Sequence, residues 1–259
     1  MLVEILGANS WLVALGLNSG LLVIALMLPK KLLTLAGYFH AWILGVVVWG
    51  TLSWAGYTVV MFYFLVGSGL TRVGKATKEA AGIAEKRGGL RGPENVWGSA
   101  LTGTVCALGT LLVLPENNQG ALWLGLLSLG YVASFATKLS DTTASEIGKA
   151  YGKRTFLITN FKPVPAGTEG AVSLEGTVAG VVASLVIAFV GWAVGLVTLG
   201  GILLCAIAAF VATYFESVIG ATLQSRYGWL TNEVVNGINT TIGALVAIGL
   251  CAAWIAIVS

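Results

Sequence analysis

The chain is dominated by apolar stretches that are long enough to cross a lipid bilayer. A membrane-spanning helix needs about 20 mostly apolar residues, and eight candidate spans can be counted at 11–28, 37–50, 54–70, 96–114, 120–137, 172–192, 196–215 and 238–258. The second and third lie so close together that they predict two helices joined by a tight turn. Hydrophobic residues make up 57% of the chain and charged residues 10%, against about 45–50% and about 25% in soluble domains. We therefore expect one all-α membrane domain over residues 1–259, a polytopic bundle of about eight transmembrane helices.

The placement of positive charge supports this count. With the N-terminus outside and eight crossings, all 14 Lys and Arg residues fall on one side of the membrane. Cytoplasmic loops carry an excess of Lys and Arg, so the basic loops are expected to face the cytoplasm or the equivalent stromal compartment of an organelle. One central helix more or fewer would scatter the basic residues over both sides.

Several function classes find no support in the residues. Basic runs with interleaved aromatic side chains are missing from the sequence, so no nucleic-acid partner is expected. The cysteines Cys106, Cys205 and Cys251 lie inside apolar stretches and are expected to pack as small hydrophobic residues. His40 is the only histidine and has no acidic residue beside it in the sequence, so an interfacial packing role is expected rather than catalysis.

The most charged part of the chain, residues 138–180, lies between predicted spans. Asp141 and Ser145 would share one face of a helix, with Glu146, Lys149 and Lys153 on a neighbouring face. Carboxylates near hydroxyls suit Mg²⁺, which binds oxygen ligands and usually keeps waters and phosphate oxygens. Lysines beside them suit the negative charge of a polyphosphate. The alternative is an ordinary polar loop that only connects two helices.

A glycine-rich segment follows in the same stretch. Gly167, Thr168 and Gly170 surround the carboxylate of Glu169, and Ser173 leads into the sixth span. Backbone N–H groups at a glycine-rich helix start can hold an anion. The sequence therefore predicts a phosphate-binding loop before the sixth span.

Two further polar segments are expected at the same membrane face. Arg87 and Arg91 lie in a glycine-containing basic turn, which suits a phosphate or, alternatively, only sets the topology. Residues 216–239 place polar groups at or within apolar spans, namely Glu216, Ser217, Gln224, Asn232 and Asn236. They would line a polar cavity or, alternatively, hydrogen-bond one helix to another.

Four segments resemble the DUF92 family of membrane proteins, which includes the plant phytyl-phosphate kinase of tocopherol biosynthesis. They are GIAE at 82–85 with the basic turn 87–91, SDTTASEIG at 140–148, PAGTEGAVS at 165–173, and GATLQ at 220–224 with Asn232, Glu233 and Asn236. The resemblance runs from about residue 68 to the end of the chain. The chain departs from the family pattern at Glu216, where the family has an aspartate. The sequence is more distantly similar to phytol kinases, dolichol kinases and CTP-dependent lipid cytidylyltransferases.

This resemblance implies a polyprenyl-monophosphate kinase that converts phytyl phosphate and a nucleoside triphosphate, with CTP a frequent donor, to phytyl diphosphate. The implied catalytic residues are Asp141, Glu146, Lys149 and Glu169. The implied Mg²⁺ ligands are Asp141, Glu146 and Glu169. The implied nucleotide and phosphate contacts are Arg87, Arg91, Lys153, Lys162, Gly167, Thr168, Gly170 and Ser173. The implied polar substrate cavity contains Glu216, Ser217, Gln224, Asn232 and Asn236.

Two other functions remain open at this stage. A CTP-dependent lipid cytidylyltransferase would use the same two substrates. A lipid or small-molecule transporter would use the polar groups of the last spans as its pathway. The expected partners are a nucleoside triphosphate, an isoprenoid phosphate and membrane lipid. The sequence does not decide whether the chain forms a homo-oligomer.

Overall fold

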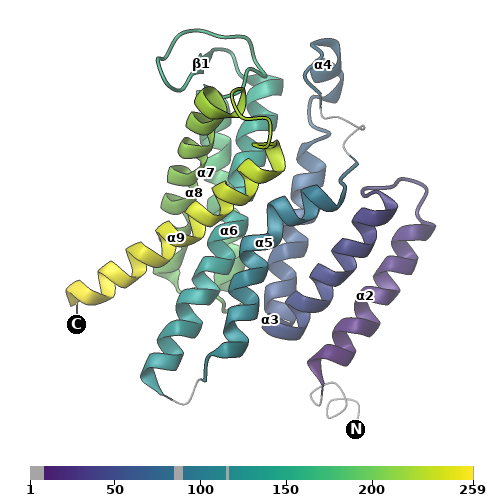
Figure 1. Ribbon diagram of the computed structural model, residues 1–259, viewed down its shortest axis with the longest axis vertical. Helices are drawn as coiled ribbons and strands as arrows, with labels where there is room; N and C mark the ends of the chain where they lie inside the picture. The colour runs from purple at the N-terminus through teal and green to yellow at the C-terminus, as the bar shows by residue number, and fades with distance from the viewer. Residues whose placement is uncertain (1–8, 85–89, 115–116, 259) are drawn as a thin grey trace.

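The fold is a helix bundle with a small two-stranded hairpin at one end (Figure 1). We describe it from a computed structural model, which describes residues 9–84, 90–114 and 117–258. The long helices are α2 (Ser10–Met27), α3 (Leu35–Leu70), α5 (Pro93–Gly109), α6 (Asn118–Tyr151), α7 (Leu174–Ala193), α8 (Leu199–Ile219) and α9 (Asn232–Val258). The shorter elements are α4 (Lys75–Ala80), the 3₁₀ turn η2 (Thr110–Leu112), the π-helical segment η3 (Gly220–Gln224), β1 (Thr155–Leu157) and β2 (Ala171–Ser173).

Helix α3 folds back on itself at Ser53 and forms two antiparallel arms. Ser53 has non-helical backbone angles, φ 54° and ψ −153°, and the rings of Trp49 and Tyr57 meet across the bend with centroids 5.2 Å apart. A straight helix would separate Gly37 and Gly67 by about 45 Å, yet both lie against Arg91. The two helices joined by a tight turn that the sequence predicts are therefore confirmed.

The number of crossings agrees with the sequence. Among the described residues, six helices are long and apolar enough to cross a membrane: α2, α3, α6, α7, α9, and α8 together with η3. The two arms of α3 cross separately, and α5 continues into η2 to span residues 93–112. Together these give eight passes, so the expected polytopic all-α bundle is confirmed.

Helix α6 forms the centre of the bundle and packs against α3, α5, α7, α8 and α9. Its side chains Tyr131, Phe135 and Leu139 are fully buried in the core, and the Tyr131 hydroxyl donates a 2.7 Å hydrogen bond to the carbonyl of Gly56. With 34 residues, α6 is about 50 Å long, whereas the apolar part of a bilayer is about 30 Å thick. The C-terminal part of α6 therefore reaches the polar region, and it carries Asp141.

Small residues bring α7 close to α6. A Cβ atom on Gly176 would lie 2.5 Å from the carbonyl oxygen of Ala144, and one on Gly180 would lie 2.9 Å from that of Ser140. Neither position has room for a larger side chain. This close packing fixes the charged end of α6 against the start of α7.

The polar connections gather at one end of the bundle (Figure 1). That end holds the connection between α2 and α3, helix α4, the antiparallel β1–β2 hairpin and the segment between α8 and α9. The sequence predicts a loop before the sixth span, and the structure adds the short hairpin there, with Thr155 paired to Ser173. The described loop lysines and arginines therefore share one end of the molecule.

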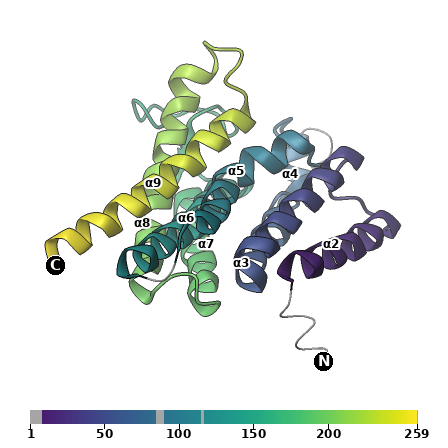
Figure 2. The ribbon, with the colours of Figure 1, turned by 60° about the horizontal axis from the view of Figure 1, so that its bottom comes forward.

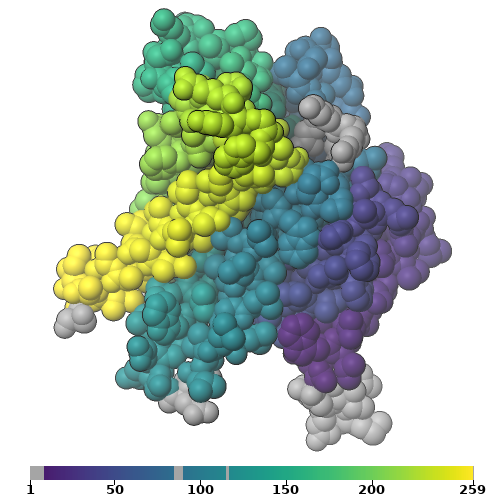
Figure 3. All heavy atoms as spheres, viewed as in Figure 1, coloured from purple at the N-terminus to yellow at the C-terminus, as the bar shows by residue number. Residues whose placement is uncertain are grey.

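The two ends of the chain pack differently. Helix α2 packs chiefly against α3 at the side of the bundle (Figure 2). Helix α9 crosses the bundle obliquely, and its C-terminal end projects beyond its neighbours (Figure 3). It begins at Asn232, earlier than the predicted eighth span, so Glu233 and Asn236 are helical residues.

Candidate functional site

A cavity of about 870 Å³ lies at the polar end of the bundle. Its walls come from α3, α5, α6, α7, α8 and α9, together with the connections around residues 82–84 and 166–173. Most of the site residues expected from the sequence line it: Arg91, Asp141, Glu146, Lys149, Gly167, Thr168, Glu169, Gly170, Ser173, Glu216, Ser217, Asn232 and Asn236. Residues that are far apart in the sequence thus share one cavity.

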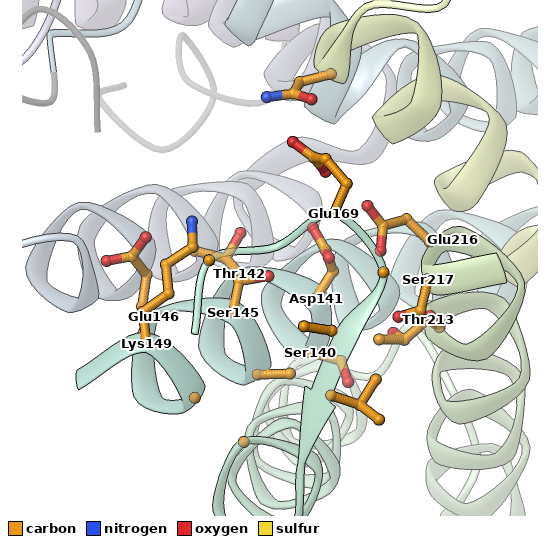
Figure 4. A pocket seen from close by; sticks show the side chains of 18 of the residues that line it. Ser140, Asp141, Thr142, Ser145, Glu146, Lys149, Glu169, Thr213, Glu216 and Ser217 are labelled. Carbon is orange, nitrogen blue, oxygen red and sulfur yellow. Dashed lines mark hydrogen bonds between the residues drawn. The ribbon is translucent and has the colours of Figure 1, made fainter. Parts of the chain in front are cut away.

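Three carboxylates from three different elements face the same part of the cavity, and we call them the acid cluster. They are Asp141 of α6, Glu169 of the loop before β2, and Glu216 of α8 (Figure 4). Glu216 lies within electrostatic range of both other carboxylates and of Lys138 and Lys149. Like charges held this close repel one another, so the acid cluster favours the binding of a cation.

Lys138 is a site residue that the assignment from sequence missed. Its Nζ donates hydrogen bonds to Asp141 Oδ2 at 2.6 Å and to Asn236 Oδ1 at 2.8 Å. A buried charge is tolerated when it is paired and hydrogen-bonded, and Lys138 satisfies both conditions. Its position three residues before Asp141 was the available signal, because residues so spaced are neighbours on a helix.

The structure gives Glu146 a partner that the sequence did not predict. Its carboxylate forms a buried ion pair with Lys78 of α4, and the two residues are only 4% and 1% exposed. Lys78 Nζ also donates a 2.9 Å hydrogen bond to the carbonyl of Thr71. Figure 4 shows Glu146 well apart from the acid cluster. Its carboxylate holds α4 on α6, and it does not join Asp141 and Glu169 in one group of ligands.

The expected set of three Mg²⁺ ligands is therefore not assembled. Among the described residues, no group of three or more Asp, Glu, His or Cys side chains could hold a metal ion by itself. Mg²⁺ in phosphoryl-transfer sites is usually bound by one or two carboxylates together with waters and substrate phosphates. The oxygen donors of the acid cluster fit that requirement.

The glycine loop, residues 165–170, is held on both sides by close contacts. Gly167 has φ +86°, and a Cβ atom there would lie 2.7 Å from the Ile83 side chain. Gly170 has φ +75°, and a Cβ atom there would lie 2.5 Å from that of Ala221 in η3. Positive φ and lack of space both require glycine. The loop thereby places Glu169 over the cavity, next to a π-helical segment of a kind that is frequent at functional sites.

Two hydroxyls of the expected phosphate loop form local hydrogen bonds within the protein. Ser173 Oγ accepts a 3.1 Å hydrogen bond from the N–H of Gly176 and so caps α7. Thr168 Oγ1 donates a 2.8 Å hydrogen bond to the carbonyl of Pro165. Both residues line the cavity, but their hydroxyls shape the loop.

Three of the described residues assigned from the sequence lie outside the lining of this cavity. Lys153 lines a separate cavity of about 440 Å³ beside Pro163. Lys162 is exposed in the turn between β1 and β2. Gln224 donates a hydrogen bond to Asn232 Oδ1, and only Asn232 of the two lines the cavity. Arg87 lies outside the described residues.

The cavity is rich in negative charge. The acidic residues of its described lining are Glu94, Asp141, Glu146, Glu169, Glu216 and Glu233. The basic residues of its described lining are Arg91, Lys138 and Lys149. The Lys138–Asp141 and Lys78–Glu146 pairs use part of this charge. Within the described lining, acidic groups outnumber basic ones, so added positive charge would favour the binding of a polyphosphate.

Comparisons with known proteins agree with this description of a membrane protein. A sequence profile described as "Integral membrane protein DUF92" matches residues 18–244. The chain is 64% identical to the membrane protein sll0875 of Synechocystis, over 94% of this chain and 92% of that protein. It is 45% identical to the chloroplastic protein VTE6 of Arabidopsis thaliana, over 92% of this chain and 71% of that protein. It is 30% identical to the membrane protein MJ0933 of Methanocaldococcus jannaschii, over 87% of this chain and 89% of that protein. No solved structure matches the chain.

Proposed function

Since this chain belongs to the DUF92 family of integral membrane proteins, we propose that it is a polyprenyl-monophosphate kinase. It transfers a phosphoryl group from a nucleoside triphosphate, with CTP the favoured donor, to an isoprenoid phosphate, with phytyl phosphate the favoured acceptor. The supporting observation is a single cavity that joins the acid cluster and its lysines to an apolar wall inside the membrane-spanning part of the bundle. The resemblance to the family that includes a phytyl-phosphate kinase gives the same answer.

The two phosphate groups would meet beside the acid cluster. Arg91 and Lys149 line the cavity, and among the described residues Lys149 forms no ion pair. We assign these two side chains to the phosphates of the nucleotide. Lys138 keeps its hydrogen bonds to Asp141 and Asn236. Its positive charge partly offsets the negative charge of the acid cluster.

The reaction requires little acid–base catalysis by the protein. An oxygen of the lipid phosphate attacks the γ-phosphorus of the nucleotide, and the bond from that phosphorus to the oxygen bridging the β-phosphate breaks. The electron pair leaves with the nucleoside diphosphate, and the lipid becomes a diphosphate. A phosphate acceptor is already largely ionised at neutral pH, so no histidine base is needed. Catalysis then rests on positioning and on neutralisation of charge.

We also propose that the site works with Mg²⁺ held by Asp141, Glu169 and Glu216 through direct or water-mediated contacts. The excess of acidic groups in the described lining supports this assignment, because two polyanionic substrates would otherwise meet a negatively charged wall. When bound, the ion supplies positive charge to the phosphate oxygens. Glu146 is left out of this set because Lys78 neutralises it.

The proposal also sets an orientation in the membrane. Nucleotides are available in the cytoplasm and in the stroma, so the polar end of the bundle faces one of those compartments. The identity with a chloroplastic protein supports a stromal orientation where the protein resides in a chloroplast. In that setting the product would serve tocopherol biosynthesis.

The decisive experiment is an assay of the purified protein. It combines the protein in detergent, Mg²⁺, each of several nucleoside triphosphates and a panel of prenyl phosphates, followed by mass spectrometry of the products. A lipid diphosphate together with a nucleoside diphosphate supports the kinase. A nucleotide-linked lipid together with pyrophosphate would instead identify a cytidylyltransferase, and absence of any covalent product would overturn the proposal.

A further inference from the structure

The cavity does not end at the acid cluster but continues down between α7 and α8. On α7, the wall is formed by Thr177 and Val181, which are one helical turn apart. On α8, it is formed by Phe210, Thr213 and Tyr214, again on one face of the helix. Val181 is eight residues beyond Ser173, or about 12 Å at 1.5 Å per residue. The cavity therefore extends well into the membrane-spanning part of the bundle.

This lower part of the cavity also reaches the outer surface of the bundle. Phe210 is 51% exposed and Tyr214 is 47% exposed, although both line the cavity. Helices α7 and α8 are joined by a short connection at the opposite end, residues 194–198. Phe210 and Tyr214 lie toward the other end of this helix pair, which holds the acid cluster. The gap between α7 and α8 is thus accessible from the surrounding lipid.

The other side of the cavity has a different chemical character. Between α5 and α9 it is lined by Asn95, Asn232, Glu233 and Asn236. A hydrocarbon chain gains free energy by leaving water and polar surfaces, at about 25 cal/mol per Å² of buried apolar area. It would gain little against these amides and carboxylates, and the gap between α7 and α8 is the better apolar route.

We propose that the isoprenoid chain of the lipid phosphate lies in the gap between α7 and α8, with its phosphate at the acid cluster. This inference rests on the proposed function and adds the location of the lipid. The isoprenoid chain then runs alongside the bilayer lipids, so the substrate reaches the site without leaving the membrane. Thr213 lies at the junction, and its buried Oγ1 has no hydrogen-bond partner among the described atoms. That hydroxyl can donate a hydrogen bond to the ester oxygen that links the isoprenoid chain to its phosphate.

A matched pair of variants tests this location. Val181 lines the cavity, while its neighbour Val182 is 53% exposed on another face of α7 and lies outside the lining. Val181→Trp should fill the gap, and Val182→Trp should add the same bulk outside it. We expect V181W to raise the KM for phytyl phosphate by roughly tenfold, equivalent to about 1.4 kcal/mol of lost binding. The KM for a short-chain prenyl phosphate should rise much less, and V182W should leave both values unchanged.

A second measurement does not depend on turnover. A phytyl phosphate analogue with a photoreactive diazirine on its hydrocarbon chain is irradiated with the wild-type protein, and the labelled peptides are identified by mass spectrometry. We expect labels on α7 and α8, and less labelling in V181W than in V182W. Labels on α5 and α9, or equal effects of the two tryptophans, would overturn the inference.

The two measurements separate this inference from the proposed function. Labelling of α7 and α8 without phosphoryl transfer would support the lipid location and contradict the proposed kinase activity. Phosphoryl transfer with labels on other helices would support the proposed kinase activity and contradict the proposed location of the lipid.

Discussion

Lys138 donates a 2.6 Å hydrogen bond from its Nζ to Oδ2 of Asp141 one helical turn further along α6, and both residues are buried. The carboxylate faces Glu169 and Glu216 on its cavity side (Figure 4). A buried ion pair at the edge of a polar cavity is a costly arrangement. Its position at the junction of α6, α8 and α9 makes it the structural centre of the candidate site.

The first prediction concerns the charge of Asp141. Asp141→Asn keeps the size of the side chain and a hydrogen-bonding group for Lys138, but it removes one negative charge from the acid cluster. We expect kcat to fall by at least about 100-fold, the scale seen when one electrostatic group of an active site is removed. The variant should still fold in detergent, although its thermal unfolding temperature should fall because buried Lys138 loses its charged partner. Near-normal phosphoryl transfer by D141N would contradict the assignment.

The second prediction tests the structural role of Glu146. Lys78→Met or Glu146→Met alone leaves one buried charge without its partner, and each should lower the free energy of unfolding by about 3 kcal/mol. The double variant K78M/E146M buries no charge and should lose clearly less than the sum of the two. The four proteins are compared by thermal unfolding in detergent.

The same four proteins distinguish a structural role from metal binding. If Glu146 only holds α4 in place, the Mg²⁺ concentration for half-maximal activity should be similar in K78M/E146M and in the wild type. A large increase in that concentration in the double variant would indicate that Glu146 takes part in Mg²⁺ binding.

The third prediction concerns Glu216 and the cation. Glu216→Gln removes one charge from the acid cluster, so the Mg²⁺ concentration for half-maximal activity should rise by about tenfold, a loss of about 1.4 kcal/mol in cation binding. Glu216→Asp restores the charge, shortened by one methylene, and should recover most of the Mg²⁺ response. Equal behaviour of the two variants would show that the charge of Glu216 does not matter.

The fourth prediction concerns the glycine loop. Gly170→Ala forces a Cβ atom toward Ala221 and the carbonyl oxygen of Ser217, at a φ of +75°. We expect kcat/KM to fall at least about tenfold, because a displacement of roughly 1 Å near reacting groups can cost up to about 100-fold. Gly237→Ala is the control, since Gly237 lies in helix α9 with open space around its Cβ position, and it should retain full activity. Similar losses in both variants would speak against a specific role of the loop.

Some of the site was predictable because its signals are local. Asp141 and Lys149 lie in one helix, and Gly167, Glu169 and Gly170 in one loop, so their spacing alone indicated that they act together. Lys138 was missed because it lies directly after the apolar stretch at 120–137, where it was taken as a loop charge. Lys153 was predicted to share a helix face with Glu146 and Lys149, but α6 ends at Tyr151, before it. Lys153 and Lys162 both lie outside the lining of the large cavity.

The sequence by itself determined the membrane class, the eight passes and the shared end of the basic loops. These properties follow from the hydrophobicity of each stretch and the order of the charges, which do not depend on how the helices pack. Only the tertiary structure decided that Glu146 pairs with Lys78, that Lys138 reaches Asn236, and that Glu216 joins Asp141. Those partners lie on different helices, and the rotation of each helix is set by small-residue contacts such as that of Gly180 with Ser140, which hydrophobicity alone does not specify.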